Sequence, residues 1–223
     1  MKTVALLPIK GNSERVPGKN FKILGHKPLF RWILDTLIAL PEIDEVIINT
    51  DAQAELEAAG LDLEDAHFSK VQLRDRKASL LGDYTSMNLI IEDDIQAVSA
   101  DRYLMTHVTN PFLSGVTIRS ALEKFQADEK FDSLFSVNRF QTRFYEADGR
   151  PVNHDPQNLV RTQDLVPWYE ENSCLYLFTR ISFATTQARI GVAPMLFETP
   201  KLESVDIDEP EDWALAEALA ERH

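Results

Sequence analysis

Three positively charged side chains lie close together near the start of the chain. The stretch PIKGNSERVPGKN, residues 8–20, follows the apolar run TVALL and contains Lys10, Arg15 and Lys19. It does not fit a phosphate-binding P-loop, because its glycines are spaced too widely and Asn20 stands where a Ser or Thr would bind magnesium. We therefore predict a strand that runs into a loop whose cations can approach an anionic ligand.

Two carboxylates near the other end of the chain could hold a metal ion. Asp206 and Asp208 lie two residues apart in the run SVDID, which predicts a strand end with both side chains on one face. Mg²⁺ takes one or two carboxylates together with substrate phosphates, so one interpretation of the pair is a site for a metal and a triphosphate. The other interpretation is structural, with Asp208 capping a helix that begins around Pro210.

A polar loop follows the predicted strand YLMT. His107, Thr109 and Asn110 lie in this loop, within the stretch HVTNPFLS, and are candidate ligand contacts. In the alternative interpretation, Asn110 and the following proline set a turn and Ser114 caps the next helix. The sequence by itself leaves both interpretations open.

A further candidate is the first turn of a predicted helix near 86–98, which contains Thr85 and Ser86. The first turn of a helix has free N–H groups that can bind an anion or the edge of a base. No serine or cysteine nucleophile can be recognised, and the histidines show no metal-ligand spacing. The charged loops are therefore the candidates for chemistry.

Strands and helices are predicted to alternate along the chain. This alternation predicts a mostly parallel sheet with helices on both faces. Because such sheets bind ligands at the carboxyl ends of their strands, the site is expected in the loops after residues 9, 50, 74 and 108. The predicted strands are TVALLPI, EVIINT, VQLR, YLMTHV, SLFSV and CLYLFT, and the predicted helices lie near 29–40, 52–59, 86–98, 114–127 and 181–188.

The segment 138–172 interrupts this alternation. A hairpin is predicted around Asp148 and Gly149, followed by a polar loop. The segment has more aromatic surface than a short hairpin can bury, so we predict an insertion that contacts a partner subunit, with a flap folded onto its own domain as the alternative. Its aromatic residues include Phe140, Phe144, Tyr145, Trp168 and Tyr169.

The composition limits the classes of protein that the chain can belong to. Its 223 residues suit one domain, residues 1–223, and its net charge of −13 argues against sequence-independent binding to nucleic acid. No run approaches the roughly 20 apolar residues that span a bilayer. The single cysteine excludes an internal disulfide and fits a reducing cytoplasm, where we expect the protein to be.

Taken in order, these motifs resemble the acylneuraminate cytidylyltransferase family, whose members make CMP-linked sialic acids and related keto-sugar acids. The resemblance extends over essentially the whole chain. Its first and last motifs are the most specific. The matching stretches are PIKGNSERVPGKN, KPLFRWILDTL, VIINTD, LRDRKASLLGDYTSM, THVTNPFLS, RTQDLVPWYEENSCLYLF and SVDIDEPEDW.

The resemblance implies a Rossmann-like nucleotidyltransferase fold, CTP and a keto-sugar acid as substrates, magnesium on Asp206 and Asp208, and a homodimer built through 138–172. The anomeric hydroxyl of the sugar acid would attack the α-phosphorus of CTP, with magnesium, Arg15 and Lys19 stabilising the developing charge. The residues that it places around the nucleotide are Lys10, Ser13, Arg15, Lys19 and Asn20, with Arg74, Thr85 and Ser86 near the base and ribose.

Departures from the family pattern concern the sugar more than the reaction. Relatives usually have Arg where Lys10 stands, and sialic acid enzymes typically have Gln and Arg where this chain has His107 and Leu113. YEEN replaces an aromatic-Arg-Pro-Asn stretch, which removes another sugar-facing cation. The candidates to replace these cations, as partners for a sugar carboxylate, are Arg139, Arg143 and Arg161.

Three alternatives stay open from the sequence. The first is an enzyme of the same fold that uses another acid or another triphosphate. The second is a nucleotide-sugar glycosyltransferase, although the Asp-x-Asp motif of those enzymes normally lies at mid-chain. The third is a non-catalytic dimer that keeps the fold, which is disfavoured because Lys19 and both aspartates are present together.

Overall fold

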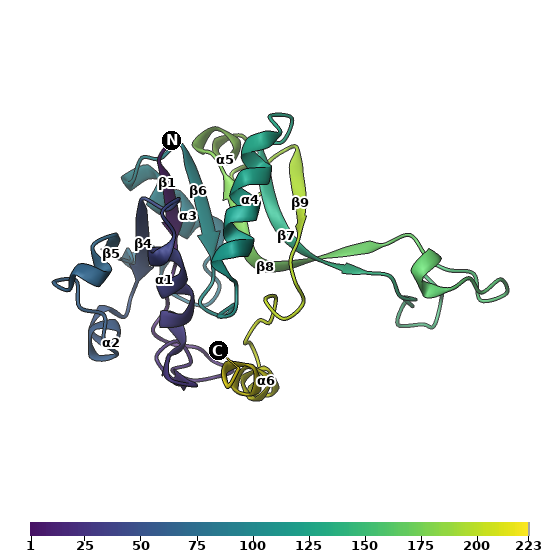
Figure 1. The fold of residues 1–223 in the computed structure, drawn as a ribbon, viewed down its shortest axis with the longest axis horizontal. Coiled ribbons are helices and arrows are strands. Elements are labelled where there is room, and N and C mark those ends of the chain that lie inside the picture. The colour runs from purple at the N-terminus through teal and green to yellow at the C-terminus, as the bar shows by residue number, and fades with distance from the viewer. Residues whose placement is uncertain (223) are drawn as a thin grey trace.

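A seven-stranded sheet with the strand order β5-β4-β1-β6-β8-β7-β9 forms the centre of the molecule in a computed structural model that describes residues 1–222 (Figure 1). Only β8 is antiparallel to its neighbours in this sheet, so the predicted mostly parallel sheet is confirmed. The strands are β1 Thr3–Leu6, β4 Glu45–Thr50, β5 Val71–Asp75, β6 Arg102–Thr106, β7 Ser133–Phe140, β8 Trp168–Phe178 and β9 Pro194–Glu198. His223 lies outside the described residues.

Helices cover both faces of the sheet, as predicted. Alternate residues of β1 belong to different buried clusters: Ala5 packs with residues of α1, α4 and α6, whereas Val4 and Leu6 pack with residues of α3 and α5. Because both faces are covered, the central strands β1, β4 and β6 are buried along nearly their whole length. The helices are α1 Leu29–Ala39, α2 Gln53–Ala58, α3 Met87–Ala97, α4 Gly115–Ala127, α5 Arg180–Thr186 and α6 Pro210–Ala220, with 3₁₀ turns at Ala66–Phe68, Ala78–Leu80 and Thr162–Asp164.

The C-terminal segment differs from its prediction. The predicted strand end over SVDID is wrong: residues 204–208 pair with no strand, and Ile207 is fixed instead by burial and by its N–H, which donates to the Thr109 carbonyl at 2.9 Å. The predicted cap is also wrong, because Glu209 rather than Asp208 caps α6 in a capping box with Asp212. The Asp208 carboxylate therefore does not cap α6.

Two strand pairs were not predicted. β9 lies beside β7 at the edge of the sheet, and Ile23–Leu24 (β2) pairs with Lys27–Pro28 (β3) in a small hairpin. Each of these segments lacks a long alternating pattern, so tertiary contacts rather than local sequence decide its structure.

The strands β7 and β8 extend beyond the sheet and carry a long arm, residues 141–167, which projects away from the body of the molecule (Figure 1). At its base Phe140 is paired with Trp168. The predicted turn around Asp148 and Gly149 is confirmed, with Gly149 at φ 85° and its N–H donating to the Glu146 carbonyl at 2.9 Å.

Across residues 1–222, no helix is long and apolar enough to cross a membrane.

Candidate active site

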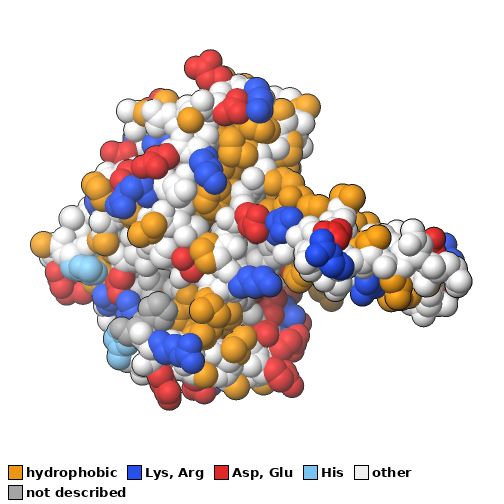
Figure 2. All heavy atoms as spheres, turned by 45° about the vertical axis from the view of Figure 1, so that its right-hand side comes forward, with side chains coloured by type: hydrophobic (Ala, Val, Ile, Leu, Met, Phe, Trp, Pro, Cys, Tyr) orange, Lys and Arg blue, Asp and Glu red, His pale blue; other side chains and the backbone are white. Residues whose placement is uncertain are grey.

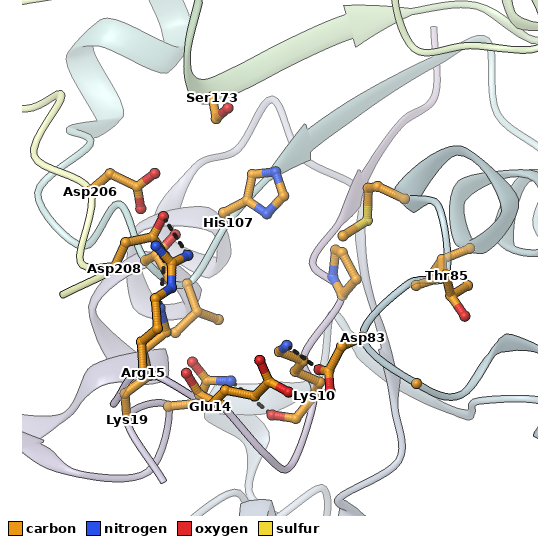
Figure 3. A pocket seen from close by; sticks show the side chains of 18 of the residues that line it. Lys10, Glu14, Arg15, Lys19, Asp83, Thr85, His107, Ser173, Asp206 and Asp208 are labelled. Carbon is orange, nitrogen blue, oxygen red and sulfur yellow. Dashed lines mark hydrogen bonds and ion pairs between the residues drawn. The ribbon is translucent and has the colours of Figure 1, made fainter. Parts of the chain in front are cut away.

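A cleft of about 520 Å³ opens at the carboxyl ends of β1, β5 and β6 (Figure 3). The loops that follow these strands provide most of its lining, and the segment before α6 closes one side. This is the edge of the sheet, at the carboxyl ends of its parallel strands, where a ligand site was predicted. The volume lies within the range of small-molecule sites. The predicted site residues in its wall are Lys10, Ser13, Arg15, Lys19, Asn20, Thr85, His107, Thr109, Asp206 and Asp208.

The loop after β1 is held in shape by contacts that leave its cations facing the cleft. The Asn20 side chain donates to the Lys10 carbonyl at 2.8 Å and so spans the loop. The Gly11 N–H donates to the Asp51 carboxylate at 2.8 Å, and a Cβ at Gly11 would lie 2.9 Å from that of Ala52. Only glycine fits this close approach without a shift of the backbone.

Two cations of this loop meet the carboxylates near the C-terminus. Lys19 is nearly buried, and its Nζ donates to the Ile207 carbonyl and, at 3.1 Å, to Asp208, which lies 189 residues away along the chain. Arg15 contacts the same Asp208 at 3.1 Å and Glu209 at 2.8 Å. The first and last motifs of the sequence therefore form one charged cluster (Figure 3).

The two aspartates have different electrostatic environments. Burial raises the pKa of Asp206, and a hydrogen bond from Thr109 offsets part of that rise. Burial acts in the same direction on Asp208, but the hydrogen bond and charge of Lys19, followed by the charge of Arg15, hold the pKa of Asp208 below its ordinary value. Asp208 is therefore the firmly ionised member of the pair.

The residues present fit a magnesium ion that also binds phosphates. Asp206 Oδ1 is buried and has no hydrogen-bond partner in the described chain, as expected of an oxygen that awaits a ligand. Among residues 1–222 no group of three or more His, Cys, Asp or Glu side chains could hold a metal by itself. A pair of carboxylates completed by substrate phosphates is the arrangement that suits Mg²⁺.

The opposite wall of the cleft is formed by the segment that leads into α3. Lys10 Nζ donates to Asp83 at 2.9 Å across the cleft mouth, and this contact lowers the pKa of Asp83. Thr85 lines the cleft, and its hydroxyl donates to the Leu81 carbonyl at 3.0 Å. Ser86 does not line the cleft; it caps α3, where its Oγ accepts from the Asn88 N–H at 3.3 Å.

Arg74 and Arg76 take different positions, although only Arg74 was predicted as a site residue. Arg74 turns toward α3 and pairs with Asp93 at 2.9 Å and with Asp94, so it lies outside the cleft. Arg76 lines the cleft, and its guanidinium donates to the carbonyls of Ile9 at 3.1 Å and Asn49 at 2.8 Å. Arg76 comes after the end of β5, so the rule that ligands bind at carboxyl ends of strands would have selected it.

The loop after β6 divides between the cleft and the core. His107 and Thr109 line the cleft. Asn110 is fully buried, and its side-chain amide donates to the Val205 carbonyl at 3.2 Å, which anchors the segment that carries Asp206. The predicted cap at Ser114 is confirmed, because its side chain accepts from the Thr117 N–H. Both interpretations of this loop therefore apply, to different residues.

The predicted sugar-binding arginines do not line the cleft of their own chain. Arg139 lies on β7, opposite Tyr169, and the other two belong to the arm. Arg143 donates to the Val160 carbonyl at 2.7 Å, and Arg161 pairs with Asp164 at 2.7 Å. Within one chain, Arg143 and Arg161 therefore make contacts inside the arm.

Ser173 and Arg189 also line the cleft without having been predicted, because their positions depend on tertiary structure. Ser173 has a positive φ of 58° at the register shift between β7 and β8, and this conformation aims it into the cleft. Arg189 lies in the loop after α5, and its guanidinium approaches His107 Nε2 at 3.3 Å. No local motif marks either residue.

A family model described as cytidylyltransferase matches residues 4–223. The chain belongs to this cytidylyltransferase family. The resemblance drawn from the sequence is thereby confirmed, as are the fold and the assignment as a nucleotidyltransferase. The family is not one of nucleotide-sugar glycosyltransferases, so that alternative is not supported.

Relatives of this cytidylyltransferase act on keto-sugar acids, according to their names. It is 26% identical to the pseudaminic acid cytidylyltransferase of Campylobacter jejuni over 98% of this chain and 96% of that protein. It is also 26% identical to the CMP-N,N′-diacetyllegionaminic acid synthase of Legionella pneumophila, over 99% and 97% of the two chains. A solved structure of a CMP:2-keto-3-deoxy-manno-octonic acid synthetase complexed with CTP shares the fold, with a TM-score of 0.67 and 14% identity over 100% of this chain and 99% of that chain.

Proposed function

We propose that this cytidylyltransferase transfers CMP from CTP to the anomeric hydroxyl of a sialic-acid-like 2-keto-3-deoxy sugar acid and releases pyrophosphate. The observation that carries the proposal is the meeting of Arg15 and Lys19 with Asp206 and Asp208 in one cleft at the ligand-binding edge of the sheet. Cations for a triphosphate and carboxylates for its metal are the two charge types that the transfer needs.

The reaction follows from the chemistry of the two substrates. The anomeric oxygen attacks the α-phosphorus, the bond from that phosphorus to the bridging oxygen breaks, and pyrophosphate leaves with the electron pair, while the hydroxyl proton passes to solvent. Lys19 and Arg15 bind phosphate oxygens and stabilise the charge that builds on them. Lys10 exchanges Asp83 for the triphosphate at the cleft mouth.

Asp206 and Asp208 would hold magnesium, which supplies charge neutralisation on the phosphates when bound. Lys19 and Arg15 both pair with Asp208. A triphosphate gives these two cations another partner, which frees the Asp208 carboxylate for the metal. Binding of nucleotide and metal is therefore expected to be mutually reinforcing.

A pyrophosphate-release assay tests this function. The purified protein is incubated with magnesium, each of the four ribonucleoside triphosphates, and pseudaminic acid, N,N′-diacetyllegionaminic acid, N-acetylneuraminic acid or 2-keto-3-deoxy-manno-octonic acid. We expect pyrophosphate with CTP and at least one acid. Release with another triphosphate would correct the nucleotide, and no release with any pair would favour the non-catalytic homologue.

We also propose that the arm, residues 141–167, forms a homodimer contact. Several of its apolar side chains are exposed, among them Val166 at 76% and Leu159 at 64%, and Trp168 at its base is 45% exposed. Hydrophobic side chains gather where the arm leaves the body (Figure 2). In such a dimer Arg139, Arg143 or Arg161 would be candidates to reach the partner's cleft. A stable monomer at micromolar concentration in light scattering would refute this role.

A further inference from the structure

The cleft has a second cationic end, separate from the loop after β1. Figure 3 shows His107 and Ser173 on the side away from Lys10 and Glu14. Arg189 lies at this end, with its Nη1 3.3 Å from His107 Nε2. Asp206 and Asp208 lie on the wall between the two ends. A ligand with anionic groups at both of its ends could therefore extend across the carboxylates.

The backbone around Arg189 is fixed from several sides. Helix α5 ends at Gln187 in a left-handed conformation with φ 56°, which turns the chain back toward the cleft. The Thr186 hydroxyl contacts the Ile190 carbonyl at 3.0 Å, and the Arg189 N–H donates to the Asn88 side chain of α3 at 3.3 Å. The next residue but one, Gly191, donates to the Ser133 hydroxyl at 2.8 Å. Arg189 is thus presented by a fixed loop.

Neighbouring residues hold the Arg189 guanidinium in place but leave some of its N–H donors available for short hydrogen bonds. It lies over the Tyr176 ring, 3.8 Å from the ring centre, and its side chain is 19% exposed. Its contacts with His107 and Glu171 are long, at 3.3 and 3.4 Å, and its third partner, the Met105 sulfur at 3.6 Å, is a weak acceptor. Glu171 does not line the cleft, and the Tyr176 hydroxyl also donates to it. A guanidinium has five donors, so short charge-assisted bonds stay available for a ligand.

His107 does not share this charge. Burial, followed by the charge of Arg189, lowers the pKa of His107 to about 3. The imidazole is therefore neutral near pH 7 and orients Arg189 by accepting from it through Nε2. Arg189 carries the positive charge at this end of the cleft.

We propose that Arg189 binds the carboxylate of the sugar acid, an assignment that rests on the proposed cytidylyltransferase reaction. A planar guanidinium matches a carboxylate in two parallel hydrogen bonds, which a lysine cannot reproduce. With the sugar carboxylate on Arg189 and the triphosphate on the loop after β1, the anomeric carbon next to that carboxylate would lie between the two ends of the cleft, along the wall that carries Asp206 and Asp208. Arg189 thus supplies, from another part of the same chain, the positive charge that the family pattern places in the stretches THVTNPFLS and YEEN.

The test compares Arg189→Met and Arg189→Lys with the wild type, using pseudaminic acid and N,N′-diacetyllegionaminic acid and the methyl ester of each. In Arg189→Met we expect the KM for the free acid to rise about 10- to 100-fold while the KM for CTP changes less than twofold. The wild-type preference for free acid over ester is expected to disappear in this variant. Arg189→Lys should restore part of the preference, because it keeps the charge and loses the fork.

Arg119→Met is the matched control, because Arg119 is a surface residue of α4 paired with Glu42 and absent from the cleft. It should leave both KM values unchanged. Thermal unfolding of each variant checks that Arg189→Met is folded. If it is not, Arg189→Lys takes its place in the comparison, because it keeps a cation near the Tyr176 ring and loses only the fork geometry.

Several results would overturn the assignment while leaving the transferase reaction intact. One is a rise in the KM for CTP in Arg189→Met. Another is a preference for the free acid over its ester that survives in Arg189→Met and is lost in Arg143→Met, which would assign the carboxylate to the arm. If the wild type releases no pyrophosphate with any of the four acids, the proposed function fails, and calorimetric titration with the same two acids decides about Arg189. Binding that is lost in Arg189→Met supports the assignment, and no binding to the wild type overturns it.

Discussion

The cleft and the arm differ in how much of their structure one chain can complete. In the cleft, charged side chains find partners far away in the sequence, as Lys19 does with Asp208. On the arm, hydrogen bonds stay within the arm, as from Arg143 to Val160 and from Asn153 to Thr142, while Val166 on the arm and Trp168 at its base are exposed. We infer that the cleft is assembled within the chain, whereas the arm depends on a partner.

Substitution of the metal-binding carboxylates is expected to give the largest effect and to separate the two regions. Asp208→Ala should lower kcat/KM about 10³-fold, because it removes the ionised carboxylate proposed to hold magnesium. The oligomeric state should not change, since the arm is untouched. Pyrophosphate release and light scattering on the same sample measure both. Loss of the dimer together with activity would contradict the separation of cleft from arm.

The complementary change acts on the arm. Replacement of Val166 and Trp168 together by serine should raise the dimer dissociation constant by about 30-fold or more, because exposed aromatic and branched side chains are typical interface anchors. Sedimentation or light scattering across a dilution series measures it. Asp148→Asn, at the exposed hairpin tip, is the control. An unchanged dissociation constant would show that the arm is a flap and not an interface.

His107 provides a test of how strongly the cleft wall shields its imidazole from water. Its folded pKa of about 3 lies below the ordinary 6.5, so the unfolded chain takes up a proton that the folded chain refuses as pH falls below 6.5. This costs about 2 kcal/mol of unfolding free energy between pH 7 and pH 5. Urea denaturation of the metal-free protein at pH 7 and pH 5 measures this loss. We expect the unfolding free energy of His107→Gln to fall by about 2 kcal/mol less than that of the wild type. His26→Gln, at an exposed position, should behave as the wild type.

Ser86 should give the smallest effect, confined to stability. As the cap of α3 it is expected to contribute about 1 kcal/mol, which Ser86→Ala removes, with little change in the KM for CTP because Ser86 does not line the cleft. Chemical denaturation and steady-state kinetics measure the two quantities. A tenfold rise in that KM with unchanged stability would return Ser86 to the nucleotide site, as the family resemblance implied.

The buried strands, the covering helices and the edge of the sheet that carries the cleft could be predicted from the sequence. Alternating patterns identified the buried strands and the covering helices, and the rule on carboxyl ends located the cleft, because these features follow from local periodicity. The short hairpin turn at Gly149 was predictable for the same reason.

Features that depend on long-range contacts could not be predicted. The segment SVDID has the composition of a strand, yet it is held by Ile207 and by Asn110 from another loop without entering the sheet. Ser173 and Arg189 reach the cleft only because of a register shift in β8 and a left-handed turn after α5. Arg74 and Arg76 differ by two positions in sequence, and the buried acids of α3 decide which one turns away.

The most direct test of the proposed reaction is a phosphorus NMR spectrum of the protein incubated with magnesium, CTP and pseudaminic acid or N,N′-diacetyllegionaminic acid. We expect a phosphodiester signal of a CMP-linked sugar and the signal of pyrophosphate to grow in equal amounts, and neither to grow with Asp208→Ala. CTP that stays unchanged with every acid, or that gives CMP and pyrophosphate without the phosphodiester, would contradict the proposed transfer.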